Sequence, residues 1–330
     1  MKVAILGNGG FGTAMALSLA RAGHAVAMWG HDAVYTTQIA ASRQNPRYLD
    51  GVTLPDSIRI GSDAAAVLDR SELVLVAVPT QHVRSVVTTV APQLPVTAPL
   101  VSLAKGLEQA TGKRPTEVIA EVLGAAARVF ALSGPSHAEE IARELPTTVV
   151  VAGHDEAGLQ WLQTALQTKS FRVYRNRDVL GIEVCGALKN VMALAAGIAD
   201  GLGYGDNAKA AILTRGLVEM QRYGLACGAD KHTFFGLAGV GDLAVTAFSR
   251  HGRNRAFGER IGRGETLEQA LKASPKVAEG VWTSKVVAKE QARLGVEMPI
   301  AVAVSRVLFD GLPAKQAVRE LMERDPKAEA

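Results

Sequence analysis

Short apolar runs alternate with helical periodicity through the first half of the chain. The first run, at residues 3–6, leads into a glycine-rich turn and a helical pattern from residue 13 to residue 21, and a second run follows at residues 24–29. Further apolar runs lie at residues 73–78, 100–103, 129–132 and 148–151, and the last strand pattern lies at residues 171–174. Strands and helices in alternation are typical of a mostly parallel, doubly wound sheet.

After residue 178 the strand pattern stops, and almost the whole remaining sequence has helical periodicity. We therefore predict an α/β N-terminal domain with a Rossmann-type doubly wound sheet over residues 1–177. An all-α C-terminal domain is predicted over residues 178–330.

The stretch from residue 181 to residue 203 predicts a buried helix, because it has no proline and its apolar residues surround the helix on every side. Lys189 and Asn190 stand near its middle, and no other charged residue occurs between residues 184 and 199. Burying an ammonium group is costly unless a partner compensates it, and burial lowers a lysine pKa toward values useful in proton transfer. Lys189 is therefore a candidate catalytic residue; the alternative is a lysine whose long side chain carries its charge to water.

Gly7, Gly9 and Gly12 form a GxGxxG pattern between the first apolar run and the first helix. Glycine at these places permits the tight turn, the close approach of a pyrophosphate and the packing of the helix on the strand. The helix N-terminus supplies N–H donors and partial positive charge. This strand–turn–helix context predicts a dinucleotide site.

Cofactor choice depends on the residue that ends the second strand, because an acid there binds a ribose hydroxyl and disfavours a 2′-phosphate. Gly30 or His31 occupies this position and neither is acidic, whereas Asp32 would serve only if the register shifts. We expect NADP(H) to be the preferred cofactor, with NAD(H) possible.

Two later apolar runs end at polar residues, where open α/β sheets bind ligands. Lys105 follows the run at residues 100–103, and Gly134 and Ser136 follow the run at residues 129–132. Lys105 can also be a solvated loop residue, and Ser136 with Glu139 also fits a capping box at a helix start.

Two polar stretches interrupt the helical part. Asp242 stands among glycines before an apolar helix, where an N-terminal cap is the alternative to a functional role. The densest basic stretch covers residues 250–255. Within it, Arg253 and Asn254 fit a phosphate site, although most such arginines are solvated.

Composition narrows the function. The 330-residue chain is 48% hydrophobic, and 36 basic against 32 acidic residues give a formal charge of +4. This mild excess fits small anionic ligands and not nucleic acid, because no basic stripe is interleaved with aromatics.

Cys185 and Cys227 form no CxxC pair, so we expect buried thiols in a reducing compartment and no metal site. We find no secretory signal and no run of roughly 20 apolar residues that would span a membrane, which predicts a cytoplasmic protein.

Together these motifs resemble the NAD(P)-dependent glycerol-3-phosphate dehydrogenase family, bacterial type, from the glycine turn to about Pro299. The longest matching stretch is GALKNVMALAAGIADGLGYGDNAKAA, which contains Lys189. The other motifs are AKGLE at Lys105, SGPSHAEE from residue 133, TRGLVEM from residue 214, GLAGVGDL at Asp242, GRNRAFG at Arg253 and VAEG at Glu279.

The resemblance implies reversible, NAD(P)H-dependent reduction of dihydroxyacetone phosphate to sn-glycerol 3-phosphate, feeding glycerophospholipid synthesis, with Lys189 as the general acid and base. The substrate contacts that it implies are Lys105, Gly134, Ser136, Lys189, Asp242, Gly252, Arg253 and Asn254. The cofactor contacts that it implies, beside Gly7, Gly9 and Gly12, are Gly10, Phe11, His31, Lys105, Ala138, Arg253, Val277 and Glu279.

The chain also departs from the family pattern. The family usually has phenylalanine at His137, often arginine at His31 and usually serine at Gly252, so only a backbone contact is expected from Gly252. His137 fits either a helix start or a new polar contact.

Two other functions are weighed against this one. A β-hydroxyacid or 6-phosphogluconate dehydrogenase shares the domain plan and a catalytic lysine, but the adjacent Lys189 and Asn190 and the GRNR stretch argue against it. A non-catalytic nucleotide sensor leaves the buried lysine unexplained. Helical second domains of this kind often pair, so a homodimer is possible.

Overall fold

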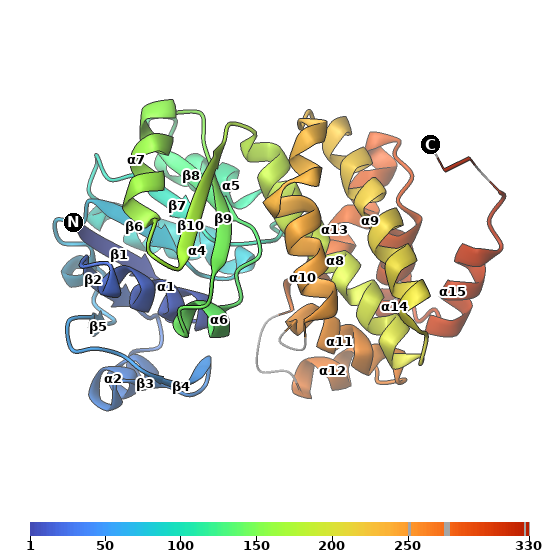
Figure 1. The fold of residues 1–330 in the computed structure, drawn as a ribbon, viewed down its shortest axis with the longest axis horizontal. Helices are drawn as coiled ribbons and strands as arrows, with labels where there is room; N and C mark the ends of the chain where they lie inside the picture. Colours follow the sequence, from blue (N-terminus) through green and yellow to red (C-terminus); the bar gives the residue numbers. More distant parts are fainter. Residues whose placement is uncertain (250–251, 274–277, 327, 330) are drawn as a thin grey trace. The chain divides into compact units, whose positions relative to one another are not determined.

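The computed structural model describes residues 1–249, 252–273, 278–326 and 328–329. The chain divides into two compact units. The N-terminal unit consists of residues 1–105 and 113–183, and the helical unit of residues 106–112 and 184–330. In Figure 1 the colour runs along the chain from the blue strands of the first unit to the red helices at the end of the second.

The N-terminal unit is built on a single large sheet with the strand order β10-β9-β8-β7-β6-β1-β2-β5. Neighbours from β8 to β5 are parallel, whereas β9 is antiparallel to β8 and parallel to β10. The strands are β1 (Lys2–Leu6), β2 (Ala25–Trp29), β5 (Arg59–Gly61), β6 (Leu73–Val76), β7 (Leu100–Ser102), β8 (Val129–Ser133), β9 (Thr147–Ala152) and β10 (Phe171–Asn176). The predicted doubly wound α/β fold is confirmed.

Helices cover both faces of this sheet because successive strand residues are apolar on both sides. Val3 and Ile5 of β1 belong to one core cluster, with α1 (Gly10–Arg21), α6 (Ala138–Ala142) and α7 (Glu156–Leu166). Ala4 and Leu6 belong to the opposite cluster, with α3 (Ala64–Leu68), α4 (Thr80–Val90) and α5 (Pro115–Leu123).

Between β2 and β5 the structure contains elements that the hydrophobic pattern did not predict. After α2 (Ala33–Ser42) comes a small antiparallel hairpin of β3 (Gln44–Asn45) and β4 (Leu49–Thr53). Outside this stretch, a one-turn helix that was also not predicted, η1 (Ala91–Gln93), follows α4. The hairpin was missed because β3 is two residues long and β4 is largely exposed, so neither shows an apolar run.

The helical unit is organised around α8 (Val179–Gly201), which starts at the end of the N-terminal unit. Cys185, Leu188, Val191 and Met192 are fully buried, so the predicted buried helix is confirmed. The other elements are α9 (Asp206–Ala226), η2 (Lys231–Phe235), η3 (Leu237–Gly241), α10 (Asp242–Phe248), α11 (Arg253–Gly262), α12 (Leu267–Ala273), α13 (Glu279–Leu294), α14 (Pro299–Phe309) and α15 (Ala314–Met322).

By length and composition α8 is the one described helix that could cross a membrane, with a mean hydropathy of 1.6. However, 94% of its apolar window is buried inside the protein, as in the core helix of a globular domain. The two cysteines are not joined by a disulfide. Cys185 is buried as expected, whereas Cys227 is half-buried.

Candidate active site

Lys189 lies in the middle of α8, and its side chain is buried within the helical unit. The residue is 7% exposed. Its Nζ donates a hydrogen bond to Thr246 Oγ1 at 2.8 Å and lies 3.1 Å from Asp242 Oδ1. The alternative of a lysine that extends to water is therefore wrong.

Asp242 and Thr246, the two partners of Lys189 named above, lie on α10, one helical turn apart. Asp242 is the first residue of α10 and 2% exposed, and Thr246 Oγ1 donates to its Oδ1 at 3.2 Å. Because residues four apart share a helix face, both side chains reach the same ammonium group. Asp242 does not cap the helix; Gly241 holds that position. Sequence reasoning missed Thr246, because its partner Lys189 is distant in the sequence.

The buried pair of Lys189 and Asp242 compensates two charges that would each be costly alone. Removing one partner of such a pair typically costs about 3–5 kcal/mol, because the other charge stays buried and uncompensated. The arrangement therefore keeps an ammonium group in a dry site, with a carboxylate and a hydroxyl that fix its position.

Asn254, predicted to contact the substrate, forms hydrogen bonds within the helical unit. It is 7% exposed; its Nδ2 donates to Asn190 Oδ1 at 2.8 Å, and its Oδ1 accepts from Gly280 N at 3.0 Å. Asn190 Nδ2 in turn donates to Gly186 O at 3.2 Å. The amide of Asn254 thus joins α8, α11 and the start of α13, where Glu279 is the first helical residue.

Arg253 and Arg255 have different surroundings although they lie two residues apart. Arg255 Nη1 pairs with Asp200 at 2.8 Å and with Glu259 at 3.0 Å. Arg253 is exposed at the first position of α11 and forms no ion pair with any described residue. Its guanidinium and the N-terminus of α11 therefore remain available to an anion.

Gly252 is the buried N-cap of α11 and offers no side-chain cap. A Cβ at this position would lie 2.7 Å from Thr246 O. A side chain at this position would therefore press against the backbone of α10.

Lys105, Gly134 and Ser136 come together in the N-terminal unit, as the ends of adjacent parallel strands predict. Lys105 Nζ donates to Gly134 O at 2.8 Å and to Ser136 Oγ at 3.1 Å, and Ser136 Oγ donates to Gly134 O at 2.8 Å. Ser136 does not form a capping box, because the N-cap of α6 is His137. The lysine is held in place by neighbouring oxygens and is not a solvated loop residue.

The glycine turn has the geometry that a dinucleotide requires. Gly7 has φ +119°, a conformation that favours glycine. A Cβ on Gly12 would lie 2.1 Å from Gly7 O, so the first turn of α1 packs tightly on the strand end. Gly9, the N-cap of α1, has no atom within 4 Å of where its Cβ would lie, which leaves open space at the helix N-terminus.

The remaining predicted cofactor residues are spread over both units. Phe11 and Ala138 lie half-buried, packed against the core cluster of α1, and a Cβ on Gly10 would lie 3.8 Å from Ala138 Cβ. His31 is exposed after β2. Val277 lies outside the described residues.

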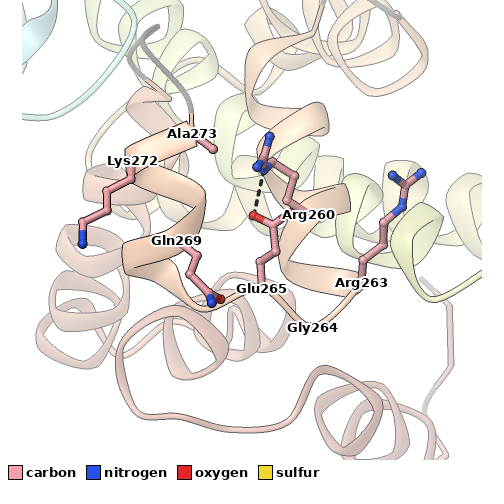
Figure 2. A pocket seen from close by; sticks show the side chains of 7 residues that line it. All are labelled: Arg260, Arg263, Gly264, Glu265, Gln269, Lys272 and Ala273. Atoms are coloured by element: carbon pink, nitrogen blue, oxygen red, sulfur yellow. Dashed lines mark hydrogen bonds and ion pairs between the residues drawn. The ribbon is translucent and has the colours of Figure 1, made fainter.

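The hollow in Figure 2 contains none of the predicted site residues. It occupies about 650 Å³ at the turn between α11 and α12. Its cations are already paired: Arg260 with Glu265 at 2.9 Å, Lys272 with Glu268 at 2.7 Å, and Arg263 with Glu259. A second hollow of about 580 Å³ lies between α7 and β10. Among the described residues no group of His, Cys, Asp and Glu could hold a metal ion.

Comparison with known families matches both units. Residues 2–158 match the model of the NAD-dependent glycerol-3-phosphate dehydrogenase N-terminus, and residues 178–319 match that of its C-terminus. The chain is 48% identical to the glycerol-3-phosphate dehydrogenase [NAD(P)+] of Chlorobium limicola, over 100% of this chain and 99% of that protein.

Solved structures agree. The glycerol-3-phosphate dehydrogenase of Coxiella burnetii superposes with a TM-score of 0.94 at 37% identity, over 98% of this chain and 99% of that one. GPD1 of Saccharomyces cerevisiae gives a TM-score of 0.82 at 28% identity, over 98% and 99% of the two chains.

Proposed function

The chain belongs to the NAD-dependent glycerol-3-phosphate dehydrogenase family, and from this premise we propose that it reversibly reduces dihydroxyacetone phosphate to sn-glycerol 3-phosphate with NADPH or NADH. It is an NAD(P)-dependent oxidoreductase. The observation that carries the proposed mechanism is the buried Lys189, hydrogen-bonded to Thr246 and beside Asp242.

Lys189 acts as the general acid in the direction of reduction. Bound NAD(P)H supplies the hydride that reduces substrate C2, and the carbonyl oxygen becomes an alkoxide as the hydride arrives. The Lys189 ammonium donates one proton to this oxygen, giving the alcohol and a neutral amine. In oxidation of the alcohol the amine takes the proton back.

Asp242 and Thr246 position the ammonium group. The Asp242 carboxylate compensates the positive charge before proton transfer, and the Thr246 hydroxyl can hydrogen-bond the nitrogen in both protonation states. We assign Lys105 to the electrostatic stabilisation of the developing alkoxide, supported by its fixed place beside Gly134 and Ser136.

The substrate phosphate is assigned to Arg253 and to the N-terminus of α11. Arg253 has no competing carboxylate among the described residues, and α11 begins without a side-chain cap, so its first N–H groups can also donate. Asn254 fixes the start of α11 relative to α8 and α13, because its side chain donates to Asn190 and accepts from Gly280 N. Fixing the phosphate brings C2 into a reactive position.

The cofactor is assigned to the glycine turn of Gly7, Gly9 and Gly12, supported by the open N-terminus of α1. In this assignment residues 1–177 form the dinucleotide-binding domain, which also contributes Lys105, and residues 178–330 form the substrate-binding domain. We further propose that the protein is a cytoplasmic homodimer. Its product, glycerol 3-phosphate, would supply glycerophospholipid synthesis.

The test is the initial rate of NADPH and NADH oxidation with dihydroxyacetone phosphate, on the wild-type protein and on Lys189→Ala. We expect turnover by the wild type and a fall in kcat of about 10²–10⁴-fold in the variant, because a general acid contributes about that much. Cofactor affinity should be nearly unchanged.

Lys209→Ala is the matched control, since Lys209 lies in the same motif but pairs with Asp200 at 2.7 Å. Near wild-type turnover by Lys189→Ala would reject the general-acid role. Reduction of NADP+ by a 3-hydroxyacid or by 6-phosphogluconate, with no oxidation of NADPH by dihydroxyacetone phosphate, would reject the proposed substrate.

A further inference from the structure

The end of β2 in this chain has no acidic side chain free to hold the adenosine ribose. A Cβ on Gly30 would lie 2.2 Å from Asn8 Nδ2 and from Thr36 Oγ1, so no side chain fits there. Asp32 is the N-cap of α2, and its Oδ1 accepts from Tyr35 N at 3.0 Å. The carboxylate that would disfavour a 2′-phosphate is therefore engaged in capping a helix.

An arginine stands near this place instead, at the tip of the hairpin of β3 and β4. The Arg47 guanidinium carbon lies 5.6 Å from the ring centroid of Tyr35 and 5.2 Å from that of Tyr48. The two rings meet edge to face, 5.8 Å apart. Arg47 is exposed and forms no ion pair with a described carboxylate, so its charge is held in place but not neutralised.

A chain of hydrogen bonds fastens this hairpin to the glycine turn. Asn45 is 1% exposed, and its Nδ2 donates to Asn8 O at 2.8 Å and to Thr13 Oγ1 at 2.7 Å. Tyr35 Oη donates to Asn45 Oδ1 at 2.6 Å and accepts from Arg47 N at 3.1 Å. The side chains of Tyr35 and Asn45 thus connect the backbone of Arg47 to the glycine turn.

The same hairpin also approaches the first turn of α1. A Cβ on Gly10 would lie 2.8 Å from Tyr48 O. Since the pyrophosphate binds at this helix N-terminus and the adenosine ribose lies toward the end of β2, Arg47 is on the adenosine side of the site.

We propose that Arg47 binds the 2′-phosphate of NADP(H) and sets the preference of this enzyme for NADP(H) over NAD(H). The inference rests on the proposed function only in taking an NAD(P) cofactor at the glycine turn. A guanidinium matches a phosphate with two parallel hydrogen bonds, and the two tyrosine rings hold it ready, which reduces the entropy lost on binding.

The experiment measures binding in the absence of substrate, by calorimetry, for the wild type and Arg47→Gln. The ligands are NADPH and NADH, and adenosine 2′,5′-bisphosphate and 5′-AMP. We expect the wild type to bind the first ligand of each pair more tightly. Arg47→Gln should lose about 10- to 100-fold in affinity for NADPH and the bisphosphate, as for a charged hydrogen bond. NADH should weaken by less than about fivefold, because the exposed arginine then has no phosphate partner.

Arg172→Gln is the matched control, because Arg172 lies 5.1 Å from the ring of Tyr174 on the edge strand β10 and also stacks on a tyrosine. It should leave all four affinities unchanged. Equal weakening of NADPH and NADH by Arg47→Gln would overturn the proposal, as would a wild type without preference. If the binding pattern holds and dihydroxyacetone phosphate is not reduced, the proposed function fails and the role of Arg47 stands.

Discussion

Glu219 on α9 is a buried carboxylate outside the proposed reaction. It is 2% exposed, and its two oxygens accept from Ile300 N at 2.8 Å and Ala301 N at 3.1 Å, at the start of α14. Burial raises its pKa to about 7, against the opposing effects of these two N–H groups and of Arg222 and Arg324. The folded protein therefore binds a proton at Glu219 more tightly than the unfolded chain does.

This pKa makes the free energy of unfolding depend on pH. Between pH 4.5 and about 7 the folded state holds the proton and the unfolded state has lost it, so stability falls as pH rises through this range. The loss amounts to about 3 kcal/mol and is complete above the folded pKa. Glu219→Gln, which does not titrate, should remove it.

Urea unfolding of the wild type and Glu219→Gln at pH 5 and pH 8 measures the effect. The wild type should lose about 3 kcal/mol more than the variant on going to pH 8. Parallel losses in the two proteins would show that Glu219 titrates normally.

The residues predicted from the sequence were those with a local signal. Lys189 stands out as a charge in an apolar helix, and Gly7 has a motif around it. Thr246 and Arg47 had no such signal, because their importance comes from partners distant in the sequence: Lys189 for the first, and the ring of Tyr35 for the second. Such pairs become visible only when the chain is folded.

At the scale of elements, α8 and α11 pack closely through glycines. Gly197 and Gly201 on α8 and Gly258 and Gly262 on α11 each lack room for a Cβ, which would lie between 2.0 and 2.3 Å from a carbonyl oxygen of the other helix. Spaced four apart, each pair lies on one face of its helix. This contact sets α11, which begins at Arg253, against the helix that carries Lys189.

Gly258→Ala should therefore destabilise the protein by about 1–3 kcal/mol, the usual cost of overpacking. Its Cβ would lie 2.2 Å from Leu194 O and 3.0 Å from Ile198 N, backbone atoms that cannot turn aside. Thermal unfolding measures the change. Gly205→Ala is the control, since no atom lies within 4 Å of a Cβ there. An unchanged melting temperature for Gly258→Ala would mean that the two helices separate at little cost.

Most strands were predictable because each is a continuous apolar run between helical segments. The predicted ends were less accurate: β6 stops at Val76, two residues before the end of its apolar run, and α1 begins at Gly10 inside the glycine motif. β5 and the hairpin of β3 and β4 left no signal, because they are short and partly exposed. Their places depend on hydrogen bonds such as those of Asn45, which periodicity does not encode.

At the scale of the whole molecule, each unit has its own buried core, which is the condition for two unfolding transitions instead of one. The tryptophans separate the units: Trp29 and Trp161 lie in the first, and Trp282 lies on α13 in the second. The variant W282F keeps Trp29 and Trp161 and so reports on the N-terminal unit. The variant W29F/W161F keeps Trp282 and reports on the helical unit.

NADPH at about 100 times its dissociation constant should stabilise the N-terminal unit by about 2.7 kcal/mol, because only the folded unit binds it. Fluorescence-detected unfolding of W282F should shift by this amount, while the transition of W29F/W161F should shift less. Gly258→Ala, added to each variant, should give the reverse pattern, since α8 and α11 meet in the helical unit. Coincident transitions in both variants, with and without NADPH, would show that the chain unfolds as one cooperative body, and the proposed division after residue 177 would then have no thermodynamic meaning.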